Sequence, residues 1–298
     1  VVLPQAPDLN VLILAWGRRI MLPLLLLGTF LLGSHADQDW QVSDLRVESL
    51  RSPSGVDTNS PRFSWKNVAA SRGSQQTQYK LELMNADNSV QLWSTTREGG
   101  ASVLQPYKGP LLDSDTPYTW RVQTWAGNLS ASASASFSTG LLSADWKGAK
   151  WIAGGDGKNL LRKTFTVGSG MRRASIFISG VGYHELYVNG VRVGSFRRLD
   201  VAPTDYAKRV YYSSYDVTEF LKPGANAVGV MLGNGWFAKA GGMPNSIDSP
   251  PQLLFLMNIH GDQPSSVISD ESWVAKEGPV KYDSLYNGET YDATAEIP

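Results

Sequence analysis

Short runs in which apolar and polar residues alternate, separated by turns, constrain the fold of this chain more than any other feature. In the run TPYTWRVQTW (116–125), the side chains of Tyr118, Trp120 and Val122 fall on one face of a β-strand. No helix-period segment of useful length interrupts the runs between residues 44 and 140. The alternation therefore predicts an all-β protein. Further strands are predicted at PRFSW (61–65), YKLEL (79–83) and ASASASFSTG (131–140).

The predicted strands divide into two series, which indicates two consecutive β-sandwich domains. The first series, over residues 41–140, is typical of a fibronectin type III-like sandwich, and Tyr118 follows LLDSDTP where such sandwiches often carry a tyrosine corner. The polar segment LLSADWKGAK (141–150) bridges to the second series. The second series favours a jelly-roll sandwich over residues 145–298.

The N-terminal region has the layout of an export signal. Basic residues Arg18 and Arg19 precede an apolar run at 22–33, and a small-x-small site ends at Ala36. The run is shorter than the roughly 20 apolar residues that a membrane span needs. We expect a signal peptide at 21–36, a mature start near Asp37 and a secreted or periplasmic protein, and a buried apolar strand or helix is the alternative. Residues 1–20 precede the first methionine and are expected to be an upstream segment outside any domain.

Composition and charge exclude several classes of function. The 27 Lys plus Arg residues balance 27 Asp plus Glu residues, so no basic field favours nucleic acid as a partner. The chain has no cysteine, which excludes disulfides, thiolate nucleophiles and cysteine metal sites. It also has no phosphate-binding loop, no metal-binding histidine pair and no Gly-x-Ser-x-Gly elbow.

The segment GVGYHELYVNG (180–190) places a histidine beside a glutamate between two glycine turns. In a strand, His184 shares a face with Leu186 and Val188, whereas Glu185 points to the opposite side. A histidine on an apolar face is more often a hydrogen-bonded core residue than a catalyst. We therefore interpret the pair as structural, in a strand that ends at an Asn-Gly hairpin turn.

Five carboxylates are candidates for the acid and base that glycoside hydrolysis requires. Each also has a simpler interpretation, because a carboxylate in segments such as RLDVAPTDY and YDVTEF often caps a turn through backbone N–H groups. We assign no catalytic residue among them. The candidates are Asp200, Asp205, Asp216, Glu271 and Glu289.

The glycine-rich loop GNGWFAKAGGMP (233–244) is the best candidate for ligand contact. Its glycines allow a close approach of the backbone, and Trp236 offers a flat apolar face on which a sugar ring can stack. Asn234 lies two residues earlier and can hydrogen bond to sugar hydroxyls. The alternative is a core tryptophan at the end of a glycine-rich strand.

Several long motifs, in order, resemble one known family. The chain from about residue 44 to 298 resembles the N-terminal half of the bacterial α-L-rhamnosidases of glycoside hydrolase family seventy-eight. One position departs from the resemblance: Pro203 stands where many relatives carry a tryptophan before TDY, which puts a stacking role there in doubt. The motifs are LRSPSGVDTNSPRFSW, QTQYKLEL, GVGYHELYVNGVRVG, LDVAPTDYAKRVYYSSYDVTEFLKPGANAVGVMLGNGWF, SDESW and YNGETYDATAEIP.

The resemblance implies a fibronectin-like domain followed by a jelly-roll, carbohydrate-binding-like domain. In this family, another sandwich and an (α/α)6 barrel with the acidic catalytic residues follow, so the catalytic residues are expected beyond residue 298. The relatives are inverting hydrolases that release terminal α-L-rhamnose and require no redox cofactor. We therefore expect a non-catalytic portion of a glycoside hydrolase, inactive alone, whose partners are its own downstream catalytic domain and rhamnose-containing glycosides or polysaccharides.

In some relatives the jelly-roll module binds rhamnose together with calcium. Transferred to this chain, the resemblance implies sugar contacts at Asn234 and Trp236, and calcium ligands at Asp156, Asn159 and Asn234, since calcium takes several oxygen ligands. Two alternatives stay open: a stand-alone lectin-like module, and a purely structural scaffold that binds nothing.

Overall fold

A computed structural model describes most of the chain, and every described element is a strand or a short 3-10 helix. This confirms the all-β prediction. No helix in the described part of the chain is long and apolar enough to cross a membrane. The segments expected at 1–20 and 21–36 and the expected calcium ligand Asp156 lie outside the described residues. Those residues are 39–155, 157–194, 200–241 and 247–296.

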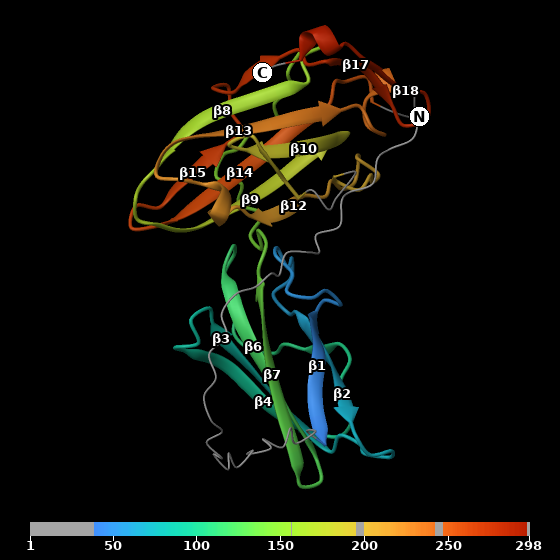
Figure 1. Cartoon of the computed structure of the whole chain (residues 1–298), viewed down its shortest axis with the longest axis vertical. Helices are drawn as coiled ribbons and strands as arrows, with labels where there is room; N and C mark the ends of the chain where they lie inside the picture. The colour runs from blue at the N-terminus through green and yellow to red at the C-terminus, as the bar shows by residue number, and fades with distance from the viewer. Residues whose placement is uncertain (1–38, 156, 195–199, 242–246, 297–298) are drawn as a thin grey trace, which may run out of the picture. The chain divides into compact units, whose positions relative to one another are not determined.

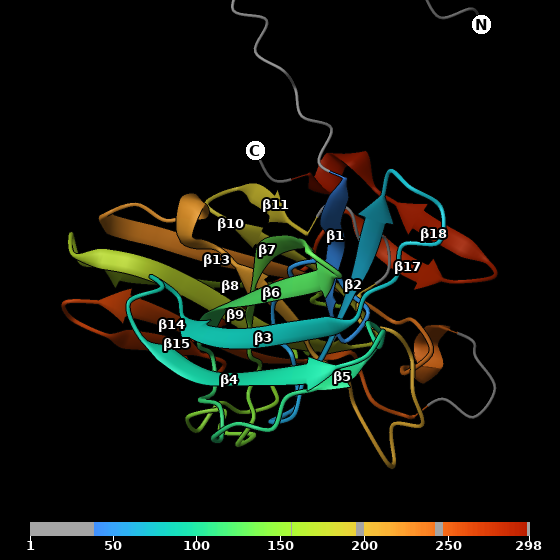
Figure 2. The same cartoon turned by 90° about the horizontal axis from the view of Figure 1, so that it is seen from below.

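The first seven strands form two antiparallel sheets, with the orders β1-β2-β5 and β4-β3-β6-β7. Figure 2 shows the second of these sheets with its four strands side by side. One core fills the space between the sheets, and in it Phe63 packs on the fully buried Trp120 at a ring distance of 4.6 Å. The strands are β1 (Trp40–Val47), β2 (Arg62–Ala69), β3 (Gln78–Asn85), β4 (Gln91–Glu98), β5 (Gln105–Pro106), β6 (Pro117–Ala126) and β7 (Leu129–Ser138).

The predicted tyrosine corner is present in this sandwich. The buried Tyr118 accepts a hydrogen bond at its hydroxyl from the backbone N–H of Asp113, at 2.9 Å. This bond returns five residues along the chain and satisfies a backbone donor in the loop before β6. It thereby holds the loop that carries Asp115.

The next nine strands form a second sandwich from two antiparallel sheets, with the orders β11-β10-β13-β8-β16 and β12-β9-β14-β15. The chain crosses between the sheets repeatedly, with only β10–β11 and β14–β15 as consecutive strands in one sheet, and the jelly-roll sandwich that the sequence predicts is observed. The strands are β8 (Leu160–Val167), β9 (Met171–Val181), β10 (Tyr183–Val188), β11 (Val191–Val193), β12 (Ser213–Asp216), β13 (Gly224–Gly233), β14 (Gln252–Gly261), β15 (Ser265–Ile268) and β16 (Val274–Lys276).

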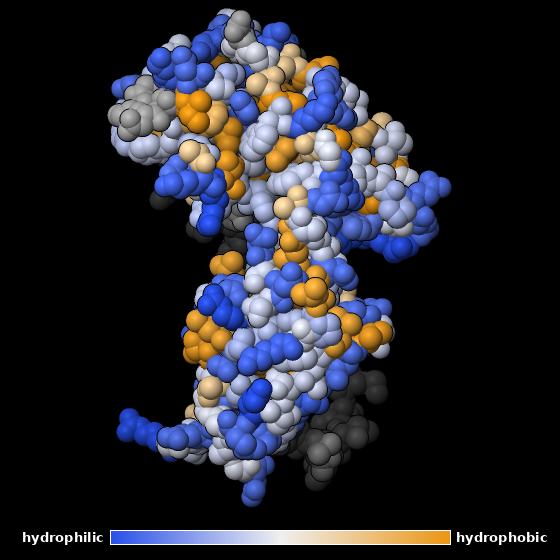
Figure 3. All heavy atoms as spheres, turned by 180° about the vertical axis from the view of Figure 1, so that it is seen from behind, coloured by the Kyte–Doolittle hydropathy of each residue, from blue (hydrophilic) through white to orange (hydrophobic). Residues whose placement is uncertain are grey.

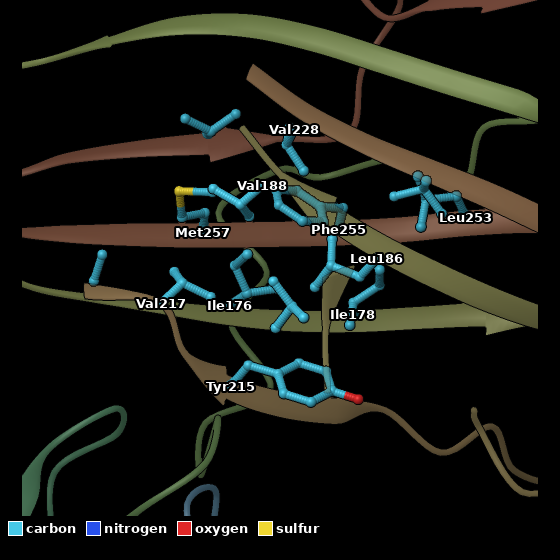
Figure 4. Close-up of a cluster of buried hydrophobic side chains, with 14 of the residues drawn as sticks. Ile176, Ile178, Leu186, Val188, Tyr215, Val217, Val228, Leu253, Phe255 and Met257 are labelled. Carbon is cyan, nitrogen blue, oxygen red and sulfur yellow. The ribbon is translucent and has the colours of Figure 1, made fainter. Parts of the chain in front are cut away.

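The core of the second sandwich follows the two-residue period of its strands. Leu186 and Val188 of β10 point inward and pack with Ile176 of β9 and Phe255 of β14, as Figure 4 shows. His184 is buried on the same side of β10, with 5% of its surface exposed, so the core position predicted for it is confirmed. Its Nε2 lies 3.6 Å from the Asp200 carboxylate.

A separate two-stranded hairpin follows the second sandwich. It consists of β17 (Val280–Ser284) and β18 (Gly288–Tyr291), which pair with each other and with no other strand in the described part of the chain. Figure 1 shows the hairpin beside the two sheets rather than within them. All four residues of β18 are exposed. Three short 3-10 helices complete the fold: η1 (Thr218–Phe220), η2 (Lys239–Gly241) and η3 (Ala293–Ala295).

The molecular surface is mixed in character. On the face that Figure 3 presents, hydrophobic residues occur in small groups separated by hydrophilic ones, which is ordinary for protein in contact with water.

A buried carboxylate joins the first sandwich to the second. Asp115 precedes β6, yet its side chain accepts hydrogen bonds from Ser175 of β9 at 2.7 Å and Asn258 of β14 at 2.8 Å. Its carboxylate also lies 2.9 Å from Arg173 and 2.8 Å from the His260 ring. Burial favours a raised pKa for Asp115, but the hydrogen bonds from His260 and Ser175 and the charge of Arg173 outweigh it and hold the pKa below its ordinary value.

We expect Asp115→Ala to lower the free energy of unfolding by about 3–5 kcal/mol at neutral pH, because it leaves the Arg173 charge without its partner. A carboxyl with a depressed pKa stabilises the fold above its ordinary value of 3.8, and this contribution is lost as pH falls through the folded pKa. The wild-type protein should therefore lose more stability below about pH 4 than the variant does. Urea unfolding at a series of pH values measures both effects.

The matched control is Asp262→Ala. Asp262 also pairs with an arginine, Arg172, at 2.5 Å, but both side chains are at least 70% exposed. Such an exposed pair contributes less than about 1 kcal/mol. If Asp115→Ala and Asp262→Ala lowered the free energy of unfolding equally, a special role for Asp115 would be contradicted.

Candidate functional site

The candidate site lies where the loop after β13 meets the β17–β18 hairpin. Asn234 and Asp283 hold these two segments together. The backbone N–H of Asn234 donates to Asp283 Oδ1 at 2.8 Å, and its Nδ2 donates to Asp283 Oδ2 at 2.9 Å. Nδ2 also donates to the Asp283 carbonyl at 3.2 Å. These three hydrogen bonds between Asn234 and Asp283 fasten the loop to the hairpin.

Asp283 faces a second carboxylate across the hairpin. The register of β17 and β18 pairs Asp283 directly with Glu289, and like charges in directly opposed positions are unfavourable. Burial raises the pKa of Asp283, and the charge of Glu289 adds to the shift, while hydrogen bonds from the backbone of Asn234 and Gly235 oppose it. Neither carboxylate has an ion pair among the described residues, and Asp283 is held by hydrogen bonds from the 234–235 backbone and the Asn234 side chain.

One pocket lies between the hairpin and the outer face of β10 and β13, and we call it the carboxylate pocket. Its volume is about 320 Å³. Tyr183, Met231 and Leu285 give it apolar walls, and Asp283 and Glu289 supply the acidic side. Glu185 also lines it, but the described structure pairs Glu185 with Arg192 at 2.7 Å. No lysine or arginine is among the described residues that line this pocket.

Gly233 keeps the carboxylate pocket open at the end of β13. A Cβ added at this position would lie 3.4 Å from Asp283 Oδ1 and 4.0 Å from the Tyr183 Cβ. The missing side chain thus leaves space between the tyrosine wall and the acidic wall.

A second pocket, which we call the lysine pocket, lies on the other side of Asp283. Its volume is about 400 Å³, and the glycine-rich segment around Gly154 and Gly155 forms part of its wall. The ammonium-bearing residues Lys158, Lys239 and Lys281 line it. Two aspartates also line it: Asp248 and Asp283.

Of the two predicted sugar-binding residues, Asn234 lines a pocket of this site, whereas Trp236 lines neither pocket and contacts tyrosines beside them. Asn234 lines the lysine pocket. Trp236 is 38% exposed and meets Tyr286 edge to face at a ring distance of 5.8 Å. Burial raises the pKa of Tyr183, and a hydrogen bond from the Trp236 side chain opposes that shift. The indole is therefore held in place by two tyrosines, with part of its surface left open to solvent.

The predicted calcium ligands are only partly brought together. Asn159 and Asn234 both line the lysine pocket, and Asp156 lies outside the described residues. Asn159 Oδ1 already accepts a hydrogen bond from the Gly278 N–H at 3.0 Å. Within the described ranges, no group of three histidine, aspartate or glutamate side chains is placed to hold a metal ion. Calcium at this site stays a prediction.

The candidate carboxylates from the sequence do not converge on one site. Asp200 is buried beside His184 and accepts a hydrogen bond from Ser213 at 2.5 Å. Asp216 caps a turn by accepting from the backbone N–H of Thr218 at 2.9 Å, as its sequence context indicates. Two other candidates form exposed ion pairs: Asp205 pairs with Lys208, and Glu271 pairs with Lys150. Glu289 alone of the five lines either pocket.

Sequence reasoning missed Asp283, Tyr183 and the three lysines. The sequence does carry a weak signal for Asp283, because YDSLYNGETY contains a turn flanked by residues of a short hairpin, in which Asp283 and Glu289 can oppose each other. No comparable signal exists for the lysines, which come from three separate segments.

Both sandwiches match domains known from one family. Residues 169–298 match the model described as alpha-L-rhamnosidase N-terminal domain, and residues 42–143 match the Rha78A-like N-terminal immunoglobulin domain. An alpha-L-rhamnosidase of Formosa agariphila is 28% identical over 94% of this chain and 34% of its own length. One from Alteromonas sp. is 29% identical over 84% of this chain and 30% of its own.

Solved structures agree with these matches. The alpha-L-rhamnosidase from Dictyoglumus thermophilum has a TM-score of 0.77 and 34% identity, covering 86% of this chain and 32% of that one. The enzyme from Aspergillus terreus has a TM-score of 0.78 and 28% identity over the same shares. The chain spans about a third of the length of the curated relatives it matches. In sequence and in fold, the chain corresponds to the two-domain N-terminal region of the α-L-rhamnosidases.

Proposed function

We propose that this chain is the non-catalytic N-terminal portion of a secreted α-L-rhamnosidase that hydrolyses terminal α-L-rhamnose from glycosides. One observation carries the proposal: both sandwiches match rhamnosidase N-terminal domains, in order, over a chain that spans about a third of its curated relatives. The two sandwiches support the downstream catalytic domain. The junction at Asp115 suits this role, because it ties the two sandwiches together.

We further propose that the second sandwich binds rhamnose at the candidate site. Rhamnose has a methyl group where most hexoses have a hydroxymethyl group, so one side of its ring is apolar and suits the exposed part of Trp236. Asn234 lies two residues before Trp236 and lines the lysine pocket. Calcium, if bound, would take oxygen ligands from Asp156, Asn159 and Asn234.

Two other functions have some support. Two pockets and an exposed indole at one end of a sandwich favour a stand-alone lectin-like module. A purely structural scaffold is favoured by the hydrogen bonds that already engage Asn234 and Asn159. The match of both domains to the N-terminal region of a hydrolase favours the rhamnosidase role over either one.

The purified protein is expected not to hydrolyse an aryl α-L-rhamnoside. An inverting glycosidase holds its two carboxyl groups about 6.5–9.5 Å apart around a water. Of the candidate carboxylates, Asp200, Asp205, Asp216 and Glu271 line neither pocket of the site, so they assemble no such pair there. A colorimetric assay, with the Aspergillus terreus enzyme as positive control, measures this. Turnover that is lost in Glu289→Gln would overturn the prediction.

L-rhamnose is expected to bind weakly, with Trp236→Ala weakening the affinity. Stacking of a ring on an aromatic face contributes roughly 1–3 kcal/mol in nucleic-acid complexes, so a loss of about tenfold is the scale expected. Calorimetry with and without calcium measures binding and any dependence on the metal. Trp151, which is also exposed at 41% but lines neither site pocket, gives the matched control Trp151→Ala. If L-rhamnose gave no binding heat either with or without calcium, the result would favour the purely structural scaffold.

Export is expected to yield a mature protein that begins near Asp37, because the small-x-small site ends at Ala36. N-terminal sequencing of protein recovered outside the cytoplasm measures the start. A mature chain that retains Met21 would refute cleavage at this site.

A further inference from the structure

The sequence contains three Asn-Gly pairs, at 189–190, 234–235 and 287–288. Asparagine is a thermolabile residue, because the backbone nitrogen of the next residue can attack its side-chain amide carbon. Glycine hinders this attack least, since it has no side chain and its backbone takes many conformations. The sequence therefore marks all three asparagines as reactive, and the fold decides which of them can react.

We propose that Asn287 is a site of spontaneous deamidation and that the fold protects the other two asparagines. The Gly288 nitrogen loses its proton to solvent and bonds to Cγ of Asn287. The bond from Cγ to Nδ2 breaks, and Nδ2 takes a proton from solvent and leaves as ammonia. Water then opens the resulting succinimide ring at either carbonyl and gives aspartate or isoaspartate. Water is the only co-reactant, nothing is oxidised or reduced, and the inference is independent of the proposed function.

Asn189 is held by hydrogen bonds on both polar atoms of its side-chain amide. Nδ2 donates to the Phe220 carbonyl and to Asn226 Oδ1, each at 2.8 Å, and Oδ1 accepts from the Ala227 N–H at 2.9 Å. The side chain must rotate before the next residue can attack it, and each bond broken in that rotation lowers the reactive population by roughly two- to tenfold. A Cβ added at Gly190 would meet nothing within 4 Å, so the side-chain hydrogen bonds, and not crowding, protect this pair.

Asn234 is protected at both reacting groups. Its Nδ2 donates to Asp283 Oδ2 at 2.9 Å and to the Asp283 carbonyl at 3.2 Å. The attacking nitrogen, which belongs to Gly235, donates a hydrogen bond to the same carboxylate. Gly235 is also crowded, since an added Cβ would lie 2.8 Å from Cδ2 of Tyr183. Ring closure at this pair would therefore break the hydrogen bonds that fasten the loop to the hairpin.

Asn287 has none of these restraints. It is exposed in the turn between β17 and β18, and its backbone N–H donates to Ser284 Oγ at 3.3 Å. No hydrogen bond engages its side-chain amide in the part of the chain that the structure describes. Gly288 has a φ of 80° and open space around it, with nothing within 4 Å of an added Cβ. The Asn287 side chain can therefore rotate toward the Gly288 nitrogen without first breaking a hydrogen bond.

Deamidation at Asn287 would change the charge of the candidate site and leave the sandwich intact. Gly288 and Glu289 line the carboxylate pocket, so the new carboxylate would stand directly beside a lining residue. The isoaspartate product would also insert a methylene group into the backbone of the turn. All of β18 is exposed and lies outside both sheets, so the core is unaffected. The aged protein is therefore expected to be a folded, more acidic form with an altered pocket.

Peptide mapping by mass spectrometry tests the inference on the purified, folded protein. Incubation at mildly alkaline pH in isotope-labelled water marks each acid group that forms during the experiment. Conversion at Asn287 is expected to be at least about tenfold faster than at Asn189 or Asn234, the combined effect of the hydrogen bonds there. The rate should rise with pH, because the attacking nitrogen must lose its proton. An acidic form should appear on anion exchange at the same rate.

Two controls separate the effect of the fold from that of exposure. Asn128 is also exposed in a hairpin turn, between β6 and β7, but Leu129 follows it, so it should convert more slowly than Asn287. Asn287→Gln should remove the acidic form, whereas the matched variant Asn128→Gln should leave it unchanged. In protein unfolded by urea, the three Asn-Gly pairs should convert at similar rates, because each has the same attacking glycine.

A preference for Asn287 that is present in the folded protein and lost in urea supports the inference. Equal conversion at all three Asn-Gly pairs in the folded protein overturns it, because the fold would then protect none of them. Conversion at Asn287 in urea but not in the folded protein also overturns it, since the turn itself would then hold the side chain. Thermal melts confirm that both variants are folded.

Discussion

The buried charge of Asp115 is the interaction on which the arrangement of this molecule depends. A carboxylate in a protein interior is costly unless hydrogen bonds and an opposite charge surround it, and here the partners come from the neighbouring sandwich. Neither domain alone completes the set. The first sandwich supplies the carboxylate and fixes its loop through the Tyr118 corner, while β9 and β14 of the second supply the donors. The junction is therefore specific, because sliding of one sandwich past the other would expose an unpaired charge.

At the candidate site, a different kind of electrostatic arrangement is found. The Asp115 carboxylate is fully compensated, whereas Asp283 and Glu289 are left facing each other beside a pocket. Two like charges at directly opposed positions of a hairpin lower its stability, so natural hairpins ordinarily avoid such pairs. Local violations of this kind are expected where function outweighs stability. The opposed carboxylates, Gly233 and the lysines of the lysine pocket all lie at this end of the second sandwich. We therefore regard it as the candidate functional end of the described chain.

Much of the architecture could be predicted from the sequence, because a strand's two-residue period shows directly which side chains point inward. The alternation placed Trp120 and Val122 on one buried face, and the same rule placed His184 with Leu186 inside the second core. The tyrosine corner also followed from one residue and its context. The junction could not be predicted, because Asp115 meets partners that are 58 to 145 residues distant, and no local pattern encodes such a contact.

The site was predicted only in part, for the same reason. Asn234 and Trp236 lie in a glycine-rich loop, which is a local signal, and of the two only Asn234 lines a pocket of the site. Asp283 depends on pairing across a hairpin, and the lysine pocket depends on three segments that meet only in the folded chain. Five carboxylates were weighed by their sequence context alone, and the structure places four of them elsewhere.

Because the β17–β18 hairpin lies outside the sheets of the second sandwich, it can shape ligand specificity without contributing to the stability of the core. The hairpin contributes walls to both pockets, yet β18 is wholly exposed and takes no part in the two sheets of the sandwich. Substitutions at residues such as Glu289 or Lys281 would alter the surface that a ligand meets without disturbing core packing. Related proteins can thus diverge in what they recognise by changing one short surface segment, while the sandwich beneath it keeps the same sequence constraints.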